Sequence, residues 1–329
     1  MSEMTYRPLG TSGLMVSTVG LGTNAFGARI DADQTQAVVD AAIDVGITLF
    51  DTSDTYGLGA SEELLGKALG KRRDDVVVAT KFGMDMRGAN GADWGARASR
   101  RYVRRAVEAS LRRLGTDYID LYQLHQPDLV TPIEETLEAL TELVAEGKVR
   151  YLGCSNFAAW EVIDAHWTAA SSGLRPFVSA QNEYSLYNRA AEEELIPALL
   201  HVRMSLIAYF PLAYGLLTGK YRRGEAAPEG SRLGNESQAH RLANADWDRI
   251  EALTAYAEDR GVDILDVAIG GLAAQPAVGS VIAGATRPEQ VHANVRAGLW
   301  APTADDLEEL GEVNTGRGAG MTHRSFTRR

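Results

Sequence analysis

Val76-Val77-Val78-Ala79-Thr80-Lys81 is an apolar run, rich in β-branched residues, that ends in a lysine. The run predicts a buried strand, and a buried strand ordinarily avoids charge. Two further strand-like runs end in the same way: Ile47-Thr48-Leu49-Phe50-Asp51, with Tyr56 five residues on, and Leu121-Tyr122-Gln123-Leu124-His125. Because all three runs carry the ionisable residue at the same end, we expect their tips to converge on one pocket.

The rest of the chain alternates between strand-like and helix-like patterns. The strand-like runs are rich in Val, Ile, Leu and Phe with little alternation, as expected for parallel strands covered on both faces. They span residues 18–23, 47–51, 76–81, 118–124, 149–155, 177–181, 206–209 and 279–282. Segments of helical period lie between them, among them 34–45, 100–114 with a cap at Ser99, and 133–144 with Pro132 as first helical residue.

Alternating strands and helices predict an α/β fold, a single (β/α)8 TIM barrel. The alternative is a doubly wound open sheet in two domains, but no linker divides the chain. We therefore treat residues 1–329 as one domain with a core from about 6 to 313. Residues 6–17 read as an N-terminal β-hairpin that plugs the barrel floor, 221–244 as a long loop, 305–313 as an extra C-terminal helix and 315–329 as a flexible tail.

The 329-residue chain has a formal net charge of −11 and a single cysteine, Cys154. An acidic chain argues against nucleic acid, whose binding needs clustered Lys and Arg. One cysteine permits no internal disulfide and favours a reducing compartment. Neither a signal peptide nor a membrane span of roughly 18 apolar residues is visible. We expect a cytoplasmic protein with no membrane association and no obligate protein partner.

The sequence lacks the motifs of several common kinds of binding and catalytic site. Gly20-Leu21-Gly22-Thr23-Asn24-Ala25 matches the loose dinucleotide fingerprint, but that motif must open a helix at once, and Phe26–Asp31 intervenes. The six histidines form no pair with metal-ligand spacing, so no metal site is predicted. There is also no nucleophile elbow and no P-loop.

The ionisable residues at the strand ends are therefore the candidate catalytic residues. In a (β/α)8 barrel, residues at the carboxyl ends of the strands line the active site. A lysine ammonium beside a tyrosine lowers the pKa of the phenol, and a carboxylate keeps that lysine charged. Tyr56 would thus be the proton donor, activated by Lys81 and Asp51. His125 would orient a substrate carbonyl.

The chain resembles the aldo-keto reductase family from about Tyr6 to about Val313. The matching motifs are Asp51–Gly57, Ala79–Gly83, Leu121–His125, Gly153–Phe157, Gln181–Tyr184 and Pro211–Tyr221. The resemblance implies a (β/α)8 barrel that reduces an aldehyde or ketone with NADPH, which becomes NADP+. It also implies a catalytic tetrad at Asp51, Tyr56, Lys81 and His125.

The same resemblance implies the cofactor contacts. Ser155, Asn156 and Gln181 would hold the nicotinamide carboxamide, because an amide needs both donors and acceptors to fix its face. Tyr209 would stack on the nicotinamide ring. Arg287 would pair with the 2′-phosphate through its planar fork. The remaining expected contacts are Gly22, Thr23, Pro211, Leu212, Gly215, Gly284, Gln290 and Asn294.

Four residues depart from the family pattern or have no role in it. Phe210 stands where many members have a small hydroxyl residue near the pyrophosphate. Gly270-Gly271 stands where a bulkier helix residue is usual, and two helical glycines predict a local weakness of about 1 kcal/mol each. Cys154 reads most simply as a small core residue.

Two other functions stay open. One is a nucleotide-binding, redox-sensing regulatory subunit. The other is a Schiff-base lyase that uses Lys81 as nucleophile, which would require a neutral lysine. The substrate is not readable from the sequence, although Phe26, Trp94, Tyr187 and Tyr214 suggest a cleft lined by aromatic rings.

Overall fold

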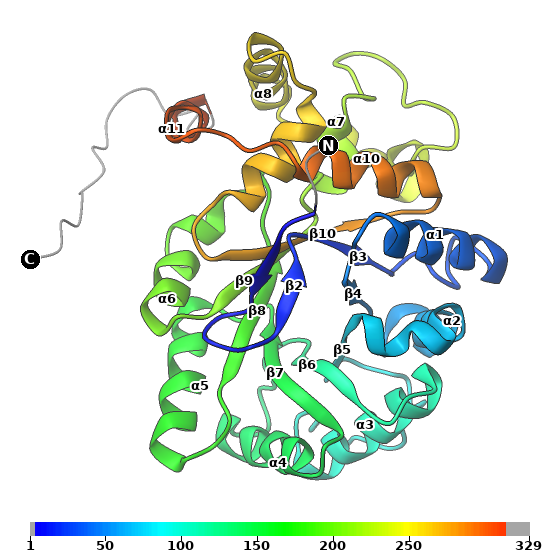
Figure 1. The fold of residues 1–329 in the computed structure, drawn as a ribbon, viewed down its shortest axis with the longest axis vertical. Helices are drawn as coiled ribbons and strands as arrows, with labels where there is room; N and C mark the ends of the chain where they lie inside the picture. Colours follow the sequence, from blue (N-terminus) through cyan, green and yellow to red (C-terminus); the bar gives the residue numbers. More distant parts are fainter. Residues whose placement is uncertain (1–3, 314–329) are drawn as a thin grey trace, which may run out of the picture.

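The computed structural model describes residues 4–313 and shows a closed barrel of eight parallel strands surrounded by helices (Figure 1). The strands follow one another around the barrel in chain order, and the last closes on the first. The barrel strands are β3 (Val19–Gly22), β4 (Leu49–Asp51), β5 (Val77–Phe82), β6 (Ile119–Leu124), β7 (Val149–Ser155), β8 (Phe177–Glu183), β9 (Ser205–Tyr209) and β10 (Val278–Gly284). The predicted TIM barrel is confirmed, and each predicted strand overlaps an observed one.

Helices cover the outside of the barrel, because each strand is buried on both faces and needs an apolar stripe packed against it. The helices that follow the strands are α1 (Ala32–Asp44), α2 (Ala60–Leu69), α3 (Arg100–Leu114), α4 (Ile133–Ala145), α5 (Ala159–Ser172), α6 (Leu195–Val202), α9 (Ile264–Asp266) with the π-helical η7 (Val267–Gly271), and α10 (Pro288–Gly298). Short 3₁₀ turns are η1 (Tyr56–Gly59), η2 (Gly70–Asp75), η3 (Ala190–Glu192) and η4 (Ala213–Thr218).

Helix positions follow the predictions, but the caps do not. Ser99 is the N-cap residue of α3, yet its hydroxyl donates to the carbonyl of Ala96 instead of accepting from the helix. Pro132 is the N-cap residue of α4 and not its first helical residue. The first correction concerns one hydrogen bond and the second a shift of one position, so the helix boundaries barely change.

The predicted N-terminal hairpin is present and closes the barrel floor. Strands β1 (Tyr6–Pro8) and β2 (Met15–Ser17) pair antiparallel, and they cross the barrel in Figure 1. Leu9, Leu14 and Val16 are buried in one cluster with side chains from inside the barrel: Leu49, Ala79, Leu121, Ile207 and Ile282. The plug keeps water out of the end opposite the candidate site.

The segment after β9 is less irregular than predicted. Residues 221–244, predicted as a long loop, contain three short helical segments, η5 (Arg232–Gly234), η6 (Glu236–Gln238) and α7 (Ala239–Ala243). Helix α8 (Trp247–Asp259) packs against α11 (Ala304–Val313), which is the predicted extra C-terminal helix. The predicted tail, 315–329, lies outside the described residues.

Gly270 and Gly271 belong to a tightly packed stretch. A Cβ atom on Gly270 would lie 2.6 Å from the carbonyl oxygen of Trp300 and 2.7 Å from that of Ala297. At Gly271 a Cβ would lie 3.2 Å from Leu310 and from Trp300 side-chain atoms. The glycines therefore let η7 approach α10 and the segment after it, so they meet a packing requirement, and their predicted cost to helix stability stays a prediction.

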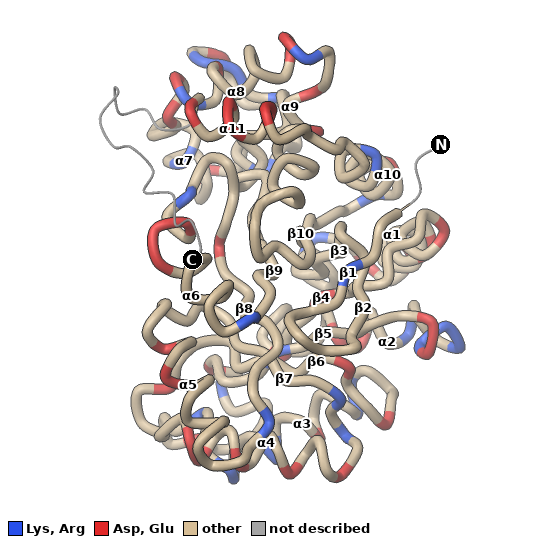
Figure 2. Tube along the Cα trace, turned by 60° about the vertical axis from the view of Figure 1, so that its left-hand side comes forward, with Lys and Arg blue, Asp and Glu red and all other residues tan. Residues whose placement is uncertain are grey.

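Charged residues lie mainly on the outer helices. In the view of Figure 2, acidic and basic residues are interspersed along these helices and form no continuous basic face. Among residues 4–313, no helix combines the length and the apolar composition that crossing a bilayer requires. The same residues contain no group of three or more His, Cys, Asp or Glu side chains placed to hold a metal ion.

Candidate active site

Lys81 is the centre of a buried polar cluster at the carboxyl ends of β4 and β5. Its side chain has no solvent exposure, and its Nζ atom donates to the two carboxylate oxygens of Asp51 at 2.8 and 2.7 Å and to the carbonyl of Thr52 at 2.8 Å. The same atom lies 3.3 Å from the hydroxyl oxygen of Tyr56. Neighbouring parallel strands bring these residues together, since Asp51 pairs with Ala79, two residues before Lys81.

The charge states of this cluster follow from burial and pairing. Burial, the largest single effect, lowers the pKa of Lys81, but the Asp51 carboxylate and the Tyr56 hydroxyl together outweigh it, so the net pKa of Lys81 is raised. For Tyr56, burial raises the pKa above its ordinary value, and the opposing effect of Lys81 does not overcome it. The expected net lowering of the Tyr56 pKa was therefore wrong. The phenol stays protonated at neutral pH, as a proton donor must.

His125 follows β6 and completes the group. Its ring lies edge-on to the Tyr56 ring, with 6.1 Å between centroids, and its Nδ1 atom is 3.0 Å from the hydroxyl of Ser53. Burial, assisted by the charge of Lys81, lowers the pKa of His125 to about 3. The imidazole is thus neutral, with one proton on one of its two nitrogens.

A cavity of about 1070 Å³ opens above these residues. Asp51, Tyr56 and His125 line it, whereas Lys81 lies behind them. The cavity also brings together every residue expected to contact the cofactor: Gly22, Thr23, Ser155, Asn156, Gln181, Tyr209, Pro211, Leu212, Gly215, Gly284, Arg287, Gln290 and Asn294. Their shared position is a structural fact, and their roles stay predictions.

The predicted carboxamide clamp is a connected network. The Ser155 hydroxyl donates to the Gln181 carbonyl at 2.8 Å, and the Asn156 amide donates to the His125 carbonyl at 2.9 Å. Tyr209 donates its hydroxyl hydrogen to Oδ1 of Asn156 at 2.7 Å. Asn156 adopts a left-handed backbone with φ of 59°, which aims its side chain across the strand end. The clamp is therefore tied to both Tyr209 and His125.

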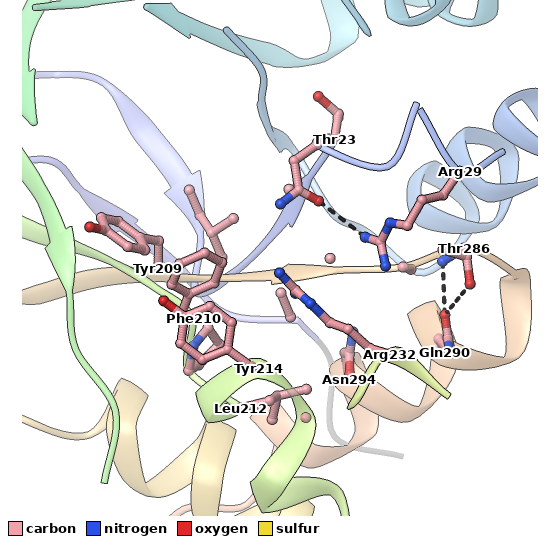
Figure 3. A pocket seen from close by; sticks show the side chains of 18 of the residues that line it. Thr23, Arg29, Tyr209, Phe210, Leu212, Tyr214, Arg232, Thr286, Gln290 and Asn294 are labelled. Atoms are coloured by element: carbon pink, nitrogen blue, oxygen red, sulfur yellow. Dashed lines mark hydrogen bonds between the residues drawn. The ribbon is translucent and has the colours of Figure 1, made fainter. Parts of the chain in front are cut away.

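The other lobe of the cavity is lined by cations. Arg287 is the N-cap residue of α10 and is 69% exposed, with Glu289 3.9 Å away. Arg29 and Arg232 approach from two further loops, and Figure 3 shows both among the residues that line the cavity. Arg232 also lies over the rings of Tyr214 and Phe210, 5.2 and 5.6 Å from their centroids. Several cations in one lobe suit an anionic ligand.

Arg29 was not among the residues expected from the sequence to contact a cofactor. Arg29 lies in the segment between β3 and α1, where Gly27 donates its amide hydrogen to the Ile30 carbonyl and turns the chain back. Its guanidinium donates to Asn24 Oδ1 at 3.3 Å. An isolated arginine in an aperiodic segment gives no sequence signal that could have placed it in the cavity.

The expected aromatic lining is largely wrong. Phe26 is buried in the core, and neither Trp94, which is 72% exposed, nor Tyr187 lines the cavity. Tyr214 does line it, with the Phe210 ring 4.4 Å from its own. Cys154 is fully buried and burial raises the pKa of its thiol, which fits a small core residue.

The chain is similar in sequence to known proteins over nearly its whole length. The sequence profile described as the Aldo/keto reductase family matches residues 18–315. The chain is 34% identical over 320 residues to the aldo-keto reductase YhdN of Bacillus subtilis, with 94% of this chain and 93% of the relative covered.

Two further relatives differ in what their names say. The uncharacterized oxidoreductase YrpG of Bacillus subtilis is 34% identical over 323 residues, with 96% of this chain and 97% of that protein covered. A probable voltage-gated potassium channel subunit beta of Arabidopsis thaliana is 36% identical over 304 residues, with 89% of this chain and 91% of that protein covered. The relatives thus include proteins named as oxidoreductases and proteins named as probable potassium channel subunits.

Proposed function

The chain belongs to the aldo/keto reductase family of oxidoreductases, and we propose that it is an NADPH-dependent enzyme that reduces an aldehyde or ketone to an alcohol. The observation that carries the proposal is the Lys81 ammonium, held by Asp51 and placed 3.3 Å from the Tyr56 hydroxyl at the wall of a large cavity. Residues in this arrangement can deliver a proton to a carbonyl oxygen and stabilise the phenolate that remains.

The donor set of the cavity fits a phosphorylated nicotinamide cofactor. Amide and hydroxyl groups lie near the tetrad, where Ser155, Asn156 and Gln181 would hold the carboxamide. Cations lie at the far lobe, where Arg287 would hold the 2′-phosphate and Arg232 would hold bridging phosphates. Gln290 accepts from the backbone and hydroxyl of Thr286 at 2.8 and 3.1 Å, which leaves its amide hydrogens for the adenosine. When bound, NADPH would supply a hydride to the carbonyl carbon.

The residues of the chain then act on the carbonyl oxygen. Tyr56 donates its phenolic proton to that oxygen as negative charge develops there. Lys81 stays cationic, because Asp51 raises its pKa, and its charge stabilises the phenolate. Neutral His125, whose ring lies edge-on to that of Tyr56, would orient the carbonyl.

The lyase alternative requires a free amine at Lys81. All three Nζ donors are directed at acceptors, namely Asp51, the Thr52 carbonyl and Tyr56. The raised pKa also keeps the nitrogen lone pair protonated. Neither observation supports a nucleophilic lysine.

The regulatory alternative has one observation in its favour, the relative named as a probable voltage-gated potassium channel subunit beta. A regulatory role would need nucleotide binding without efficient turnover. All four tetrad residues are present, so the sequence gives no sign of lost catalysis. The cytoplasmic location stays a prediction from composition.

A panel of aldehydes and ketones tests the proposal, with reduction followed by loss of NADPH absorbance. We expect turnover of at least one carbonyl class, with alcohol formed in equal amount to NADPH consumed. Tight NADPH binding without turnover of any member would favour the regulatory role. An absence of nucleotide binding would contradict both.

A further inference from the structure

A buried polar path leads from His125 away from the cavity. The Nδ1 atom of His125 is 3.0 Å from Oγ of Ser53, and that oxygen is 3.3 Å from Oδ1 of Asp54. The other carboxyl oxygen of Asp54 accepts from the amide of Asn90 at 3.1 Å. Arg113 in turn donates to Oδ1 of Asn90 at 3.1 Å. Ser53, Asp54 and Asn90 are buried, and none of them lines the cavity.

At the end of the path farthest from His125, the donor and acceptor roles of the Asn90 amide are fixed. An arginine only donates, so the oxygen of the Asn90 amide must face Arg113 and its nitrogen must face Asp54. Oδ2 of Asp54 is therefore always an acceptor. A proton on Asp54 can reside only on Oδ1, which faces Ser53. The protonation state of Asp54 thus determines whether the Ser53 hydroxyl accepts a hydrogen bond from Oδ1 or donates one to it.

The surroundings of Asp54 leave it without an ion-pair partner. Arg113, from α3, donates from Nε to Glu62 at 2.7 Å, and Glu62 also accepts from Thr80 at 2.6 Å. The other titratable groups that face Asp54 are the phenols of Tyr102 on α3 and Tyr122 on β6. Burial, and then repulsion by Glu62, raise the pKa of Asp54 to about 7 despite the attraction of Arg113.

We propose that Asp54 is a positioning residue that selects the tautomer of His125 through the hydroxyl of Ser53. When Asp54 is protonated, Oδ1–H donates to Ser53, Ser53 donates to Nδ1 of His125, and the ring proton sits on Nε2. When Asp54 is ionised, Ser53 donates to the carboxylate instead and Nδ1–H donates to Ser53, which leaves Nε2 without a proton. In both forms the single hydrogen of the Ser53 hydroxyl goes to His125 or to Asp54, so the Thr55 hydroxyl, 2.9 Å away, does not accept from it.

The two tautomers differ in what they offer a substrate. Only the Nε2–H form can donate a hydrogen bond from Nε2 to a carbonyl oxygen, so protonated Asp54 is the form that supports carbonyl polarisation. This consequence for catalysis rests on the proposed reductase function. The tautomer switch itself does not, because it needs only the folded protein.

The ¹⁵N chemical shifts of the imidazole nitrogens test the switch directly in the full chain. We expect His125 to change from the Nε2–H to the Nδ1–H tautomer between about pH 5 and about pH 9, with its midpoint at the pKa of Asp54. The His125→Asn variant identifies the signals. Asp54→Asn, whose amide nitrogen would face Ser53, should keep the Nε2–H form throughout. Ser53→Ala should abolish the pH dependence. An unchanging tautomer in the wild-type protein would overturn the proposal, whether or not the variants fold.

Steady-state kinetics test the consequence. The kcat for carbonyl reduction should fall about tenfold per pH unit above the Asp54 pKa in the wild type. Asp54→Asn should abolish this alkaline fall in kcat (the alkaline limb) and keep, at all pH values, the kcat that the wild type shows below the Asp54 pKa. Asp44→Asn, which removes an exposed carboxylate from α1, should leave the limb in place. A limb that survives Asp54→Asn would overturn the positioning role. Tautomer switching in a protein that reduces no carbonyl would uphold the switch and contradict the reductase proposal.

Discussion

The side-chain amide of Gln181 donates to Oδ1 of Asp51 at 2.7 Å, although the two residues are 130 positions apart. The bond fixes the orientation of Gln181, because its nitrogen must face the carboxylate and its oxygen is left to accept from a ligand. The proposed carboxamide clamp and the tetrad are therefore one hydrogen-bonded unit. Among residues 4–313, the Tyr56 hydroxyl is hydrogen-bonded only to Lys81, so Tyr56 is the position where proton donation can be removed with the clamp intact.

Tyr56→Phe should abolish most carbonyl reduction and leave NADPH binding nearly unchanged. Loss of a positioned general acid costs about 10²- to 10⁴-fold in rate. The phenyl ring retains the packing beside His125, so the fold should be unaffected. The measurements are kcat from NADPH absorbance and the cofactor Kd from fluorescence titration. Substantial residual turnover would contradict the assignment of Tyr56 as proton donor.

Arg287→Ala should erode a preference for NADPH over NADH. The 2′-phosphate would lose a charge-assisted hydrogen bond worth about 1–3 kcal/mol, which is roughly 5- to 150-fold in the ratio of the two Kd values. Arg296→Ala is the matched control, since Arg296 is on the same helix, pairs with Asp263 and does not line the cavity. An unchanged ratio for Arg287→Ala would direct attention to Arg232 or Arg29.

Gly270→Ala and Gly311→Ala should shift stability in opposite directions. An alanine Cβ at Gly270 would press on the carbonyl oxygens of Trp300 and Ala297, and overpacking of this kind costs about 1–3 kcal/mol. At Gly311, in α11, no atom lies within 4 Å, so the gain in helix propensity should stabilise by up to about 1 kcal/mol. Urea unfolding measures both. Stabilisation by Gly270→Ala would show that η7 and α10 can separate without cost.

The barrel was predictable because each of its strands is a short, continuous run of apolar residues in the sequence. The run Val76–Lys81 overlaps β5, Val77–Phe82, since β-branched apolar residues covered on both faces leave little choice of structure. The tetrad was predictable as a group because all carboxyl ends of a parallel barrel share one edge. Neither inference needed knowledge of a particular side-chain contact.

Features that depend on tertiary contacts were not predictable. Arg29 reaches the cavity only because the chain turns back at Gly27. The Tyr56 pKa depends on how deeply the ring is buried, which outweighs the neighbouring charge that the sequence does reveal. The role of Gly270 depends on carbonyls about thirty residues away in the chain, so composition alone did not reveal the close contact.

Lys81→Met separates the reductase from the lyase. As a reductase residue, Lys81 stabilises the Tyr56 phenolate, and its removal should lower kcat about 10²- to 10³-fold. Since its charge favours the phenolate, its loss should also move the pH dependence of the remaining activity to more alkaline values.

The variant leaves the Asp51 carboxylate buried with only the Gln123 and Gln181 amides as donors, so it should also destabilise the fold, by about 3–5 kcal/mol. Asp51→Asn/Lys81→Met removes that charge and is the control for stability. Borohydride treatment of the wild type with substrate, followed by mass spectrometry, should give no adduct, because the Nζ atom is protonated and fully hydrogen-bonded. A substrate-dependent adduct on Lys81 that is absent from Lys81→Met would overturn the reductase assignment.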